Sequence, residues 1–116
     1  MVIKLSNAFS LNMLKENTTY ISVRQIPLEE AKRLLEGGFV SFIGHDDTAR
    51  LLSGLLGLPV STNRQSLVLE DGETLLVAQY RGPRLPEGAT TLPPGARVDW
   101  FLVSVWYSAP TPSPSP

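Results

Sequence analysis

The chain has 116 residues, a formal net charge of −1 and no cysteine. This length indicates one domain, and a hydrophobic content of 42% suffices for an ordinary core. The balanced charge excludes a diffuse basic surface for long duplex nucleic acid, so any anionic ligand must be held by a few placed arginines. The lack of cysteine excludes disulfides and thiolate metal sites.

Neither a signal peptide nor a membrane span is expected. Residues 1–5 form a stretch that is too short and too soon polar for a signal peptide. No apolar run approaches the roughly 20 residues that a membrane-spanning helix needs. We therefore expect a soluble cytoplasmic protein without a membrane partner.

Strand-like and helix-like patterns follow one another in the first part of the chain. Ser10 is placed to cap a short helical turn, and Pro27 fits the first position of a helix that ends at Gly37. The expected elements are strands over residues 2–6, 18–25 and 38–43, a helical turn that reaches residue 14, and a helix over residues 27–37. The third strand is largely apolar, so we expect it to be central in the sheet.

The second part of the chain predicts one more helix and three more strands. Asp46 or Asp47 is expected to cap a helix that runs to about residue 56 and ends at Gly57. The Asp71-Gly72 pair is a strong hairpin signal between two β-rich runs. The expected elements here are a helix over residues 47–56, strands over 66–70, 73–80 and 98–107, and a Gly- and Pro-rich loop over 81–97.

Together these elements predict an α/β fold of mixed α+β character. We expect a single domain over residues 1–107, with a five- or six-stranded mixed sheet flanked by two or three helices. Residues 108–116 alternate proline with small polar residues and are expected to be a disordered tail. A loop as long as residues 81–97 is more often functional or mobile than idle in so small a domain.

His45 is the only histidine of the chain, and it stands where an apolar run gives way to a helical pattern. A strand-to-helix corner presents free backbone N–H groups, which favour an anion such as phosphate. An imidazole can also give or take a proton near neutral pH. On residue type alone, however, a lone histidine at such a corner is more often structural than functional.

Several familiar chemistries do not fit the sequence. The His45-Asp46 pair resembles that of metal-dependent phosphohydrolases, but those sites and zinc sites need further histidines. The chain has no nucleophile elbow, no phosphate-binding loop and no dinucleotide fingerprint, although its composition still allows a Ser-His-Asp triad. The pattern that remains is chemistry without metal or cofactor, with one histidine as acid or base.

Two further segments carry polar side chains that could complete a site. The first follows the expected first strand, where open α/β sheets place ligands, and the second opens the long loop. The side chains are Asn7, Ser10 and Asn12 in the first segment and Gln79, Arg81, Arg84 and Glu87 in the second. By residue type alone, turn, cap and solvated-loop roles are commoner for these residues than ligand binding.

Three blocks of the chain resemble the type III anti-CRISPR ring-nuclease family. They are Leu-Ser-Asn-Ala-Phe-Ser-Leu-Asn-Met-Leu at residues 5–14, Gly-His-Asp-Asp-Thr-Ala at residues 44–49, and Asn63-Arg64. The similarity extends from residue 2 to about residue 107 and is looser over residues 84–87. The Pro-rich tail has no counterpart in the family.

The resemblance implies a homodimer that binds cyclic tetra-adenylate, the second messenger made by type III CRISPR effectors. Members of that family cut the ring without a metal into linear di-adenylates that end in a 2′,3′-cyclic phosphate. The ribose 2′-hydroxyl attacks its own phosphate and expels the 5′-oxygen of the next nucleotide. Removal of the messenger evades immunity when the source is a virus, and limits the response when it is a bacterium.

The resemblance also assigns roles to individual residues. It implies that His45 is the general acid, that Arg84 holds the scissile phosphate and that Glu87 orients the 2′-hydroxyl. It implies phosphate, ribose and adenine contacts for Asn7, Ser10, Asn12, Arg64, Gln79 and Arg81. Two alternatives stay open: a sensor that binds a cyclic oligonucleotide without cutting it, and a small dimeric protein that binds a host protein and uses His45 structurally.

Overall fold

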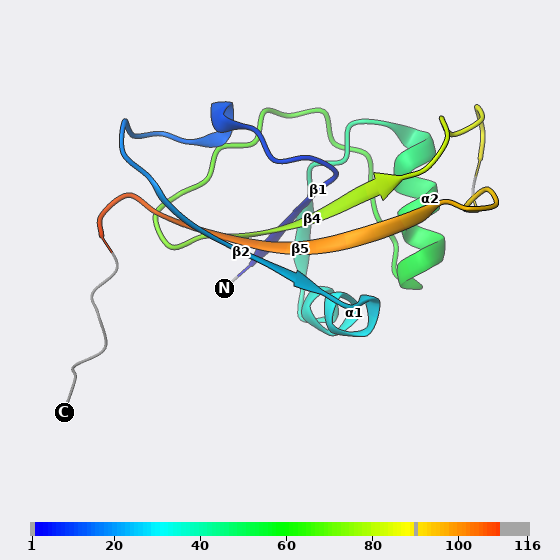
Figure 1. The fold of residues 1–116 in the computed structure, drawn as a ribbon, viewed down its shortest axis with the longest axis horizontal. Helices are drawn as coiled ribbons and strands as arrows, with labels where there is room; N and C mark the ends of the chain where they lie inside the picture. The colour runs from blue at the N-terminus through cyan, green and yellow to red at the C-terminus, as the bar shows by residue number, and fades with distance from the viewer. Residues whose placement is uncertain (1, 90, 110–116) are drawn as a thin grey trace.

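The computed structural model describes residues 2–89 and 91–109, and within them it contains one five-stranded sheet and two α-helices (Figure 1). The strands are β1 (Ile3–Ser6), β2 (Tyr20–Ile26), β3 (Phe39–Ser41), β4 (Thr74–Arg81) and β5 (Arg97–Trp106). The helices are α1 (Leu28–Glu36), α2 (Asp46–Leu56) and a 3₁₀ turn, η1 (Leu11–Met13). Of the expected tail, residues 110–116 lie outside the described residues.

The sheet has the order β2-β5-β4-β1-β3 and is mixed. β1 runs parallel to both β3 and β4, whereas β5 runs antiparallel to both β2 and β4. These pairings confirm the predicted fold class, a single α+β domain with a mixed sheet. The Ser10 cap is also confirmed, because its Oγ accepts a hydrogen bond from the Asn12 N–H at 3.2 Å.

The prediction that the third strand is central was wrong. β3 lies at one edge of the sheet and is only three residues long. Its apolar character has another cause: Phe39 packs against the core, and Ile43 beyond the strand is fully buried. An isolated parallel bridge joins Ile43 to Thr62, so an irregular segment covers this edge.

The predicted hairpin strand over residues 66–70 was also wrong. Both sides of β4 are occupied by β1 and β5, which leaves no free edge for a further strand. The segment crosses the sheet instead, with Leu67 and Leu69 buried and the Leu69 N–H donating to the Met13 carbonyl at 2.8 Å. Its alternating pattern reflects one buried side rather than strand pairing.

The helix boundaries differ from expectation at two caps. Pro27 is the N-cap of α1 rather than its first helical residue. His45, not Asp46 or Asp47, is the N-cap of α2, and its side chain makes no capping hydrogen bond. Gly57 ends α2 as predicted, in the left-handed conformation (φ 65°) that glycine adopts without strain.

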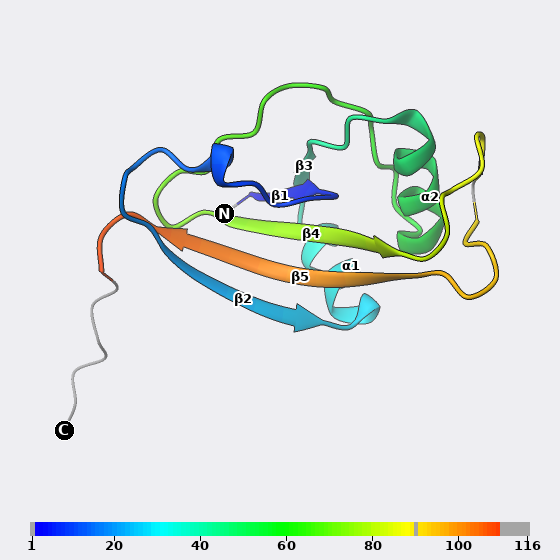
Figure 2. The same cartoon turned by 45° about the horizontal axis from the view of Figure 1, so that its top comes forward.

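The two faces of the sheet are covered differently. α1 and α2 pack on one face over a core that includes Leu5, Leu52 and Trp100. The segments around η1 and residues 61–70 cross the other face over a smaller core that includes Leu69 and Val103 (Figure 2). Within the described residues, no helix has the length and hydropathy that crossing a membrane requires.

Candidate functional site

The corner that carries His45 joins the edge of the sheet to α2. Its backbone is extended (φ −128°, ψ 134°), and its carbonyl accepts the first helical hydrogen bond, from the Ala49 N–H at 3.0 Å. The imidazole is exposed and makes no hydrogen bond to the described residues. The side chain is thus free to meet a ligand at the N-terminus of α2, where backbone N–H groups favour anions.

Arg64 is held beside this corner. Its Nε donates to the Gly44 carbonyl at 3.0 Å, and the neighbouring Thr62 hydroxyl donates to Asp46 Oδ1 at 2.6 Å. The Thr62 hydrogen bond, together with the positive charges of Arg50 and Arg64, holds the pKa of Asp46 below its usual range. The structure therefore places the Arg64 guanidinium at Gly44, the residue that precedes His45.

A cavity of about 280 Å³ lies where β1 and β4 end and α2 begins. Asn7 and Gln79 supply amide groups to its wall, and Thr48 supplies a hydroxyl from the first turn of α2. The rest of the lining is mainly apolar and consists of Leu51, Leu52, Ala78, Tyr80, Leu85 and Val98. This position matches the crevice at the carboxyl ends of strands in open α/β sheets.

A second hollow, of about 490 Å³, adjoins the cavity and is lined by Asp47, Leu85, Pro86, Arg84 and Glu87. Leu85 lines both spaces, so they are neighbours. The Gly88 N–H donates to Asp47 Oδ2 at 3.0 Å and ties the loop to the first turn of α2. Arg84 and Glu87 are exposed and line the same hollow, which suits contact with a polar ligand.

Not every predicted site residue joins these spaces. Ser10 and Asn12 lie at η1, away from the residues that line the cavity and the hollow. Arg81 turns to Asp99, with 2.5 Å between its Nε and Oδ2. Among residues 2–89 and 91–109, no hydrogen bond or ion pair joins His45 to Arg84 or Glu87.

Sequence reasoning missed three residues that shape the site. Asp47 tethers the loop, Leu85 separates the two spaces, and Asp99 holds Arg81. Asp47 lies in the block at residues 44–49 but was expected only as a helix cap, and no local motif marks Leu85 or Asp99. In the part of the chain that the structure describes, no three His, Asp or Glu side chains gather closely enough to hold a metal ion.

Comparison with known proteins finds one matching family model and a similar solved structure. A sequence model described as STIV B116-like matches residues 3–93. The structure of B116 from Sulfolobus turreted icosahedral virus superposes with a TM-score of 0.74 and 30% identity, over 92% of this chain and all of that one.

Two uncharacterized viral proteins are also similar in sequence. Protein 26 of Sulfolobus islandicus filamentous virus is 38% identical over 77 residues, which is 65% of this chain and 64% of that protein. ORF117 of Acidianus two-tailed virus is 31% identical over 77 residues, 64% of this chain and 65% of its own. The chain thus spans slightly less than two thirds of the length of these two proteins.

Proposed function

The chain belongs to the STIV B116-like family, and from that membership and the geometry at the start of α2 we propose that it is a metal-independent ring nuclease for cyclic tetra-adenylate. The observation that carries the proposal is the hollow in which Arg84 and Glu87 meet beside the first turn of α2. A guanidinium and a carboxylate in one exposed hollow can contact a phosphate and a neighbouring hydroxyl. The resemblance to ring nucleases supplies the substrate.

In the proposed reaction the nucleophile belongs to the substrate. The 2′-oxygen bonds to phosphorus as the bond to the 5′-oxygen breaks, and the 2′-hydroxyl proton leaves to solvent. Glu87 accepts a hydrogen bond from that hydroxyl and orients it, while Arg84 balances the charge on the phosphate. The products are di-adenylates with a 2′,3′-cyclic phosphate.

His45 is proposed to protonate the leaving 5′-oxygen. An alkoxide is a poor leaving group, so a general acid at this atom accelerates the reaction by about 10² to 10⁴. The exposed imidazole at the N-cap of α2 is free of competing hydrogen bonds to the described residues. Arg64 is held at the Gly44 carbonyl, and we propose that it contacts the same nucleotide.

We further propose that a homodimer encloses the ring. His45 and Glu87 are not in contact within one protomer, and a ring of four equivalent nucleotides suits a two-fold assembly. The outer edge of β2 has no partner among the described strands, and Ile21 and Val23 are 39% and 60% exposed on it. Light scattering should give twice the mass of one chain; a monomer both with and without ligand would contradict the dimer.

The experiment that tests the function is incubation of the protein with cyclic tetra-adenylate in EDTA, followed by chromatography of the products. We expect conversion of the ring to di-adenylate with a 2′,3′-cyclic phosphate. A ring that is bound but recovered intact would instead identify a sensor. A ring that is neither bound nor cut would favour the host-interaction alternative.

The biological role follows from the substrate. A protein that removes the messenger silences the nucleases that the messenger activates, and would act in the host cytoplasm where that messenger is made. The similarity to several archaeal viral proteins favours immune evasion over a cellular timer. The chain is also similar to YddF of Bacillus subtilis, with 34% identity over 62 residues, which are 51% of this chain and 57% of that protein. Because YddF is a bacterial protein, the role of a cellular timer stays open as an alternative.

A further inference from the structure

Two arginines face each other across the last rung of the β4–β5 ladder. The register pairs Arg81 with Arg97. It also pairs Gln79 with Asp99, two residues away along each strand and therefore on the same face of the sheet. Like charges directly opposite each other destabilise a strand pair. Such a pair of arginines is therefore expected only where a nearby carboxylate or a bound anion offsets the two positive charges.

Asp99 binds both arginines in the same way. Arg81 Nε donates to Oδ2 at 2.5 Å, and Arg97 Nε donates to Oδ1 at 3.1 Å. No hydrogen bond between described residues uses a terminal Nη group of either arginine. The Asp99 side chain is 13% exposed, whereas those of Arg81 and Arg97 are 50% and 70% exposed. The carboxylate therefore anchors the two guanidinium groups while their Nη groups face solvent.

This cluster carries an uncompensated positive charge. The other arginine ion pairs, Arg24 with Glu30 and Arg50 with Asp47, match one cation to one anion. Here two cations share one carboxylate. Burial raises the pKa of Asp99, but the hydrogen bonds from both arginines lower it by more, so the carboxylate stays ionised at neutral pH.

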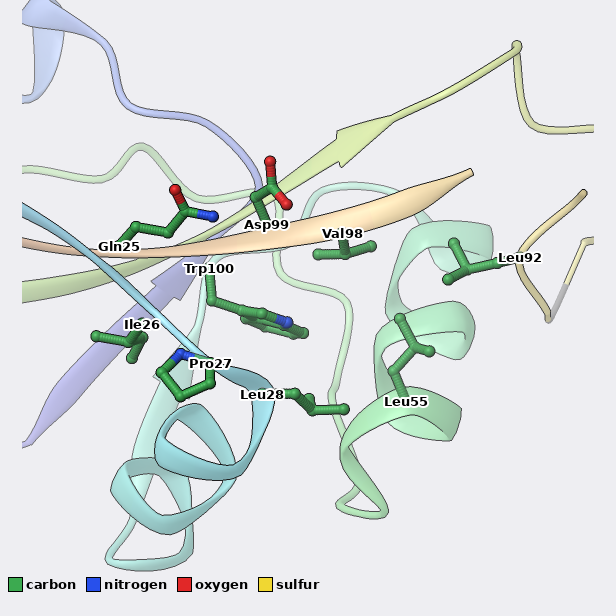
Figure 3. A pocket seen from close by; sticks show the side chains of 9 residues that line it. All are labelled: Gln25, Ile26, Pro27, Leu28, Leu55, Leu92, Val98, Asp99 and Trp100. Carbon is green, nitrogen blue, oxygen red and sulfur yellow. The ribbon is translucent and has the colours of Figure 1, made fainter. Parts of the chain in front are cut away.

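The cluster lies on the sheet face opposite the helices. Figure 3 shows Asp99 and Gln25 on one side of β5 and Trp100 on the other, where Trp100 lines a groove with Leu28 and Leu55. Gln79, opposite Asp99 in the ladder, also lines the cavity that contains Asn7. Gln79 thus lies between the cavity and the arginine cluster.

We propose that Arg81 and Arg97, held by Asp99, form a clamp for a phosphate group of the ligand. Arg97 is then a binding residue, and Asp99 is a positioning residue that acts through the two arginines. Guanidinium groups suit this task because each can offer paired N–H donors to two phosphate oxygens. The identification of that phosphate as part of cyclic tetra-adenylate depends on the proposed function, whereas phosphate binding by the clamp does not.

The test uses two probes, inorganic pyrophosphate and cyclic tetra-adenylate. In the wild-type protein, pyrophosphate should shift the NMR signals of the Arg81 and Arg97 side chains and leave Arg33, an exposed arginine of α1, unchanged. Arg97→Ala should weaken binding of the ring about 10-fold and reduce the salt dependence of binding by roughly one charge. Arg97→Lys should recover part of the affinity, and Arg33→Ala should match the wild type.

Asp99→Asn separates positioning from charge. It removes the negative charge of the cluster and so makes the cluster more positive. If the arginines act through charge alone, the variant should bind cyclic tetra-adenylate more tightly than the wild type. If Asp99 positions the two arginines, the variant should instead bind cyclic tetra-adenylate more weakly, because the guanidinium groups lose the carboxylate that holds them. Thermal melting checks that the variant folds, and the Arg81 and Arg97 NMR signals in it report the lost contacts directly.

The outcomes distinguish this proposal from the proposed function. Shifts with pyrophosphate but no binding of the ring would keep the clamp and overturn the ring as ligand. Unshifted Arg81 and Arg97 signals with both probes would overturn the clamp and identify a structural ion cluster only. Binding of the ring with wild-type affinity by Arg97→Ala would also overturn it.

Discussion

The helix-covered face of the sheet and the opposite face are built by different means. α1 and α2 cover the first with regular backbone over a core of twelve buried residues, including Leu5 and Leu52. Irregular segments around η1 and residues 61–70 cover the second over six buried residues. The Arg81 and Arg97 side chains stay exposed on that second face, and all residues of β2 except Ile26 are exposed. Regular packing stabilises the molecule, and the less regular side leaves polar groups available for a ligand.

This contrast predicts unequal costs for the same truncation on the two faces. Leu52→Ala, beneath α2, should lower the free energy of unfolding by about 3 kcal/mol, because two helices and the sheet cannot close the cavity. Leu69→Ala should cost less, about 2 kcal/mol, because irregular backbone can relax around it. Both side chains are at most 2% exposed, so the pair is matched. Urea unfolding measures both, and an equal or reversed order would contradict the contrast.

Arg84→Ala tests the loop that overhangs the start of α2. Loss of a charge-assisted contact to phosphate should weaken binding of cyclic tetra-adenylate by about 10-fold or more. The melting temperature should stay unchanged, since Arg84 is exposed and makes no hydrogen bond to the described residues. Calorimetric titration measures the affinity, with Arg33→Ala as control. Unchanged affinity would place the loop outside the site.

The second face also contains an ion pair with a predicted pH dependence. Burial raises the pKa of Glu73, but the hydrogen bonds from Lys4 and the Glu70 N–H lower it by more, to below its ordinary value of 4.5. A lowered folded-state pKa stabilises the protein above pH 4.5, and this stability is lost as the pH falls through the folded-state value. The contribution at neutral pH is about 1 kcal/mol.

Glu73→Gln should therefore be less stable than the wild type at pH 7 and close to it at pH 3. Unfolding curves at both pH values measure the difference, with the more exposed Glu70→Gln as the comparison. A gap that stays constant between pH 7 and pH 3 would show that the charge of Glu73 does not stabilise this segment.

The sequence predicted the helix-covered face well because local signals set it. Pro27, Gly37 and Gly57 mark the helix limits, and apolar residues at helical spacing mark the buried sides. The opposite face was predicted poorly because nothing local distinguishes a strand from an extended segment with one buried side. Residues 66–70 have the alternation of a strand, and only the occupied edges of β4 exclude it.

The candidate site likewise contains residues that local sequence patterns mark and contacts that they do not. The sequence blocks named Asn7, His45 and Arg64; Asn7 and His45 lie at element ends that local patterns predict, and Arg64 lies in the irregular segment between α2 and β4. The contact of Asp47 with the Gly88 N–H joins residues 41 positions apart, and the contact of Asp99 with Arg81 joins residues 18 positions apart. These contacts follow from the arrangement of β4, β5 and the loop between them, which no local pattern encodes.

Single-turnover kinetics of His45→Ala tests whether His45 is the general acid of a metal-independent ring cleavage. With enzyme in excess over cyclic tetra-adenylate in EDTA, the variant should cleave at least about 10²-fold more slowly than the wild type. Its affinity for the ring and its melting temperature should be unchanged, since the side chain is exposed and makes no capping bond. A variant that cleaves as fast as the wild type would contradict the account and leave His45 a structural residue.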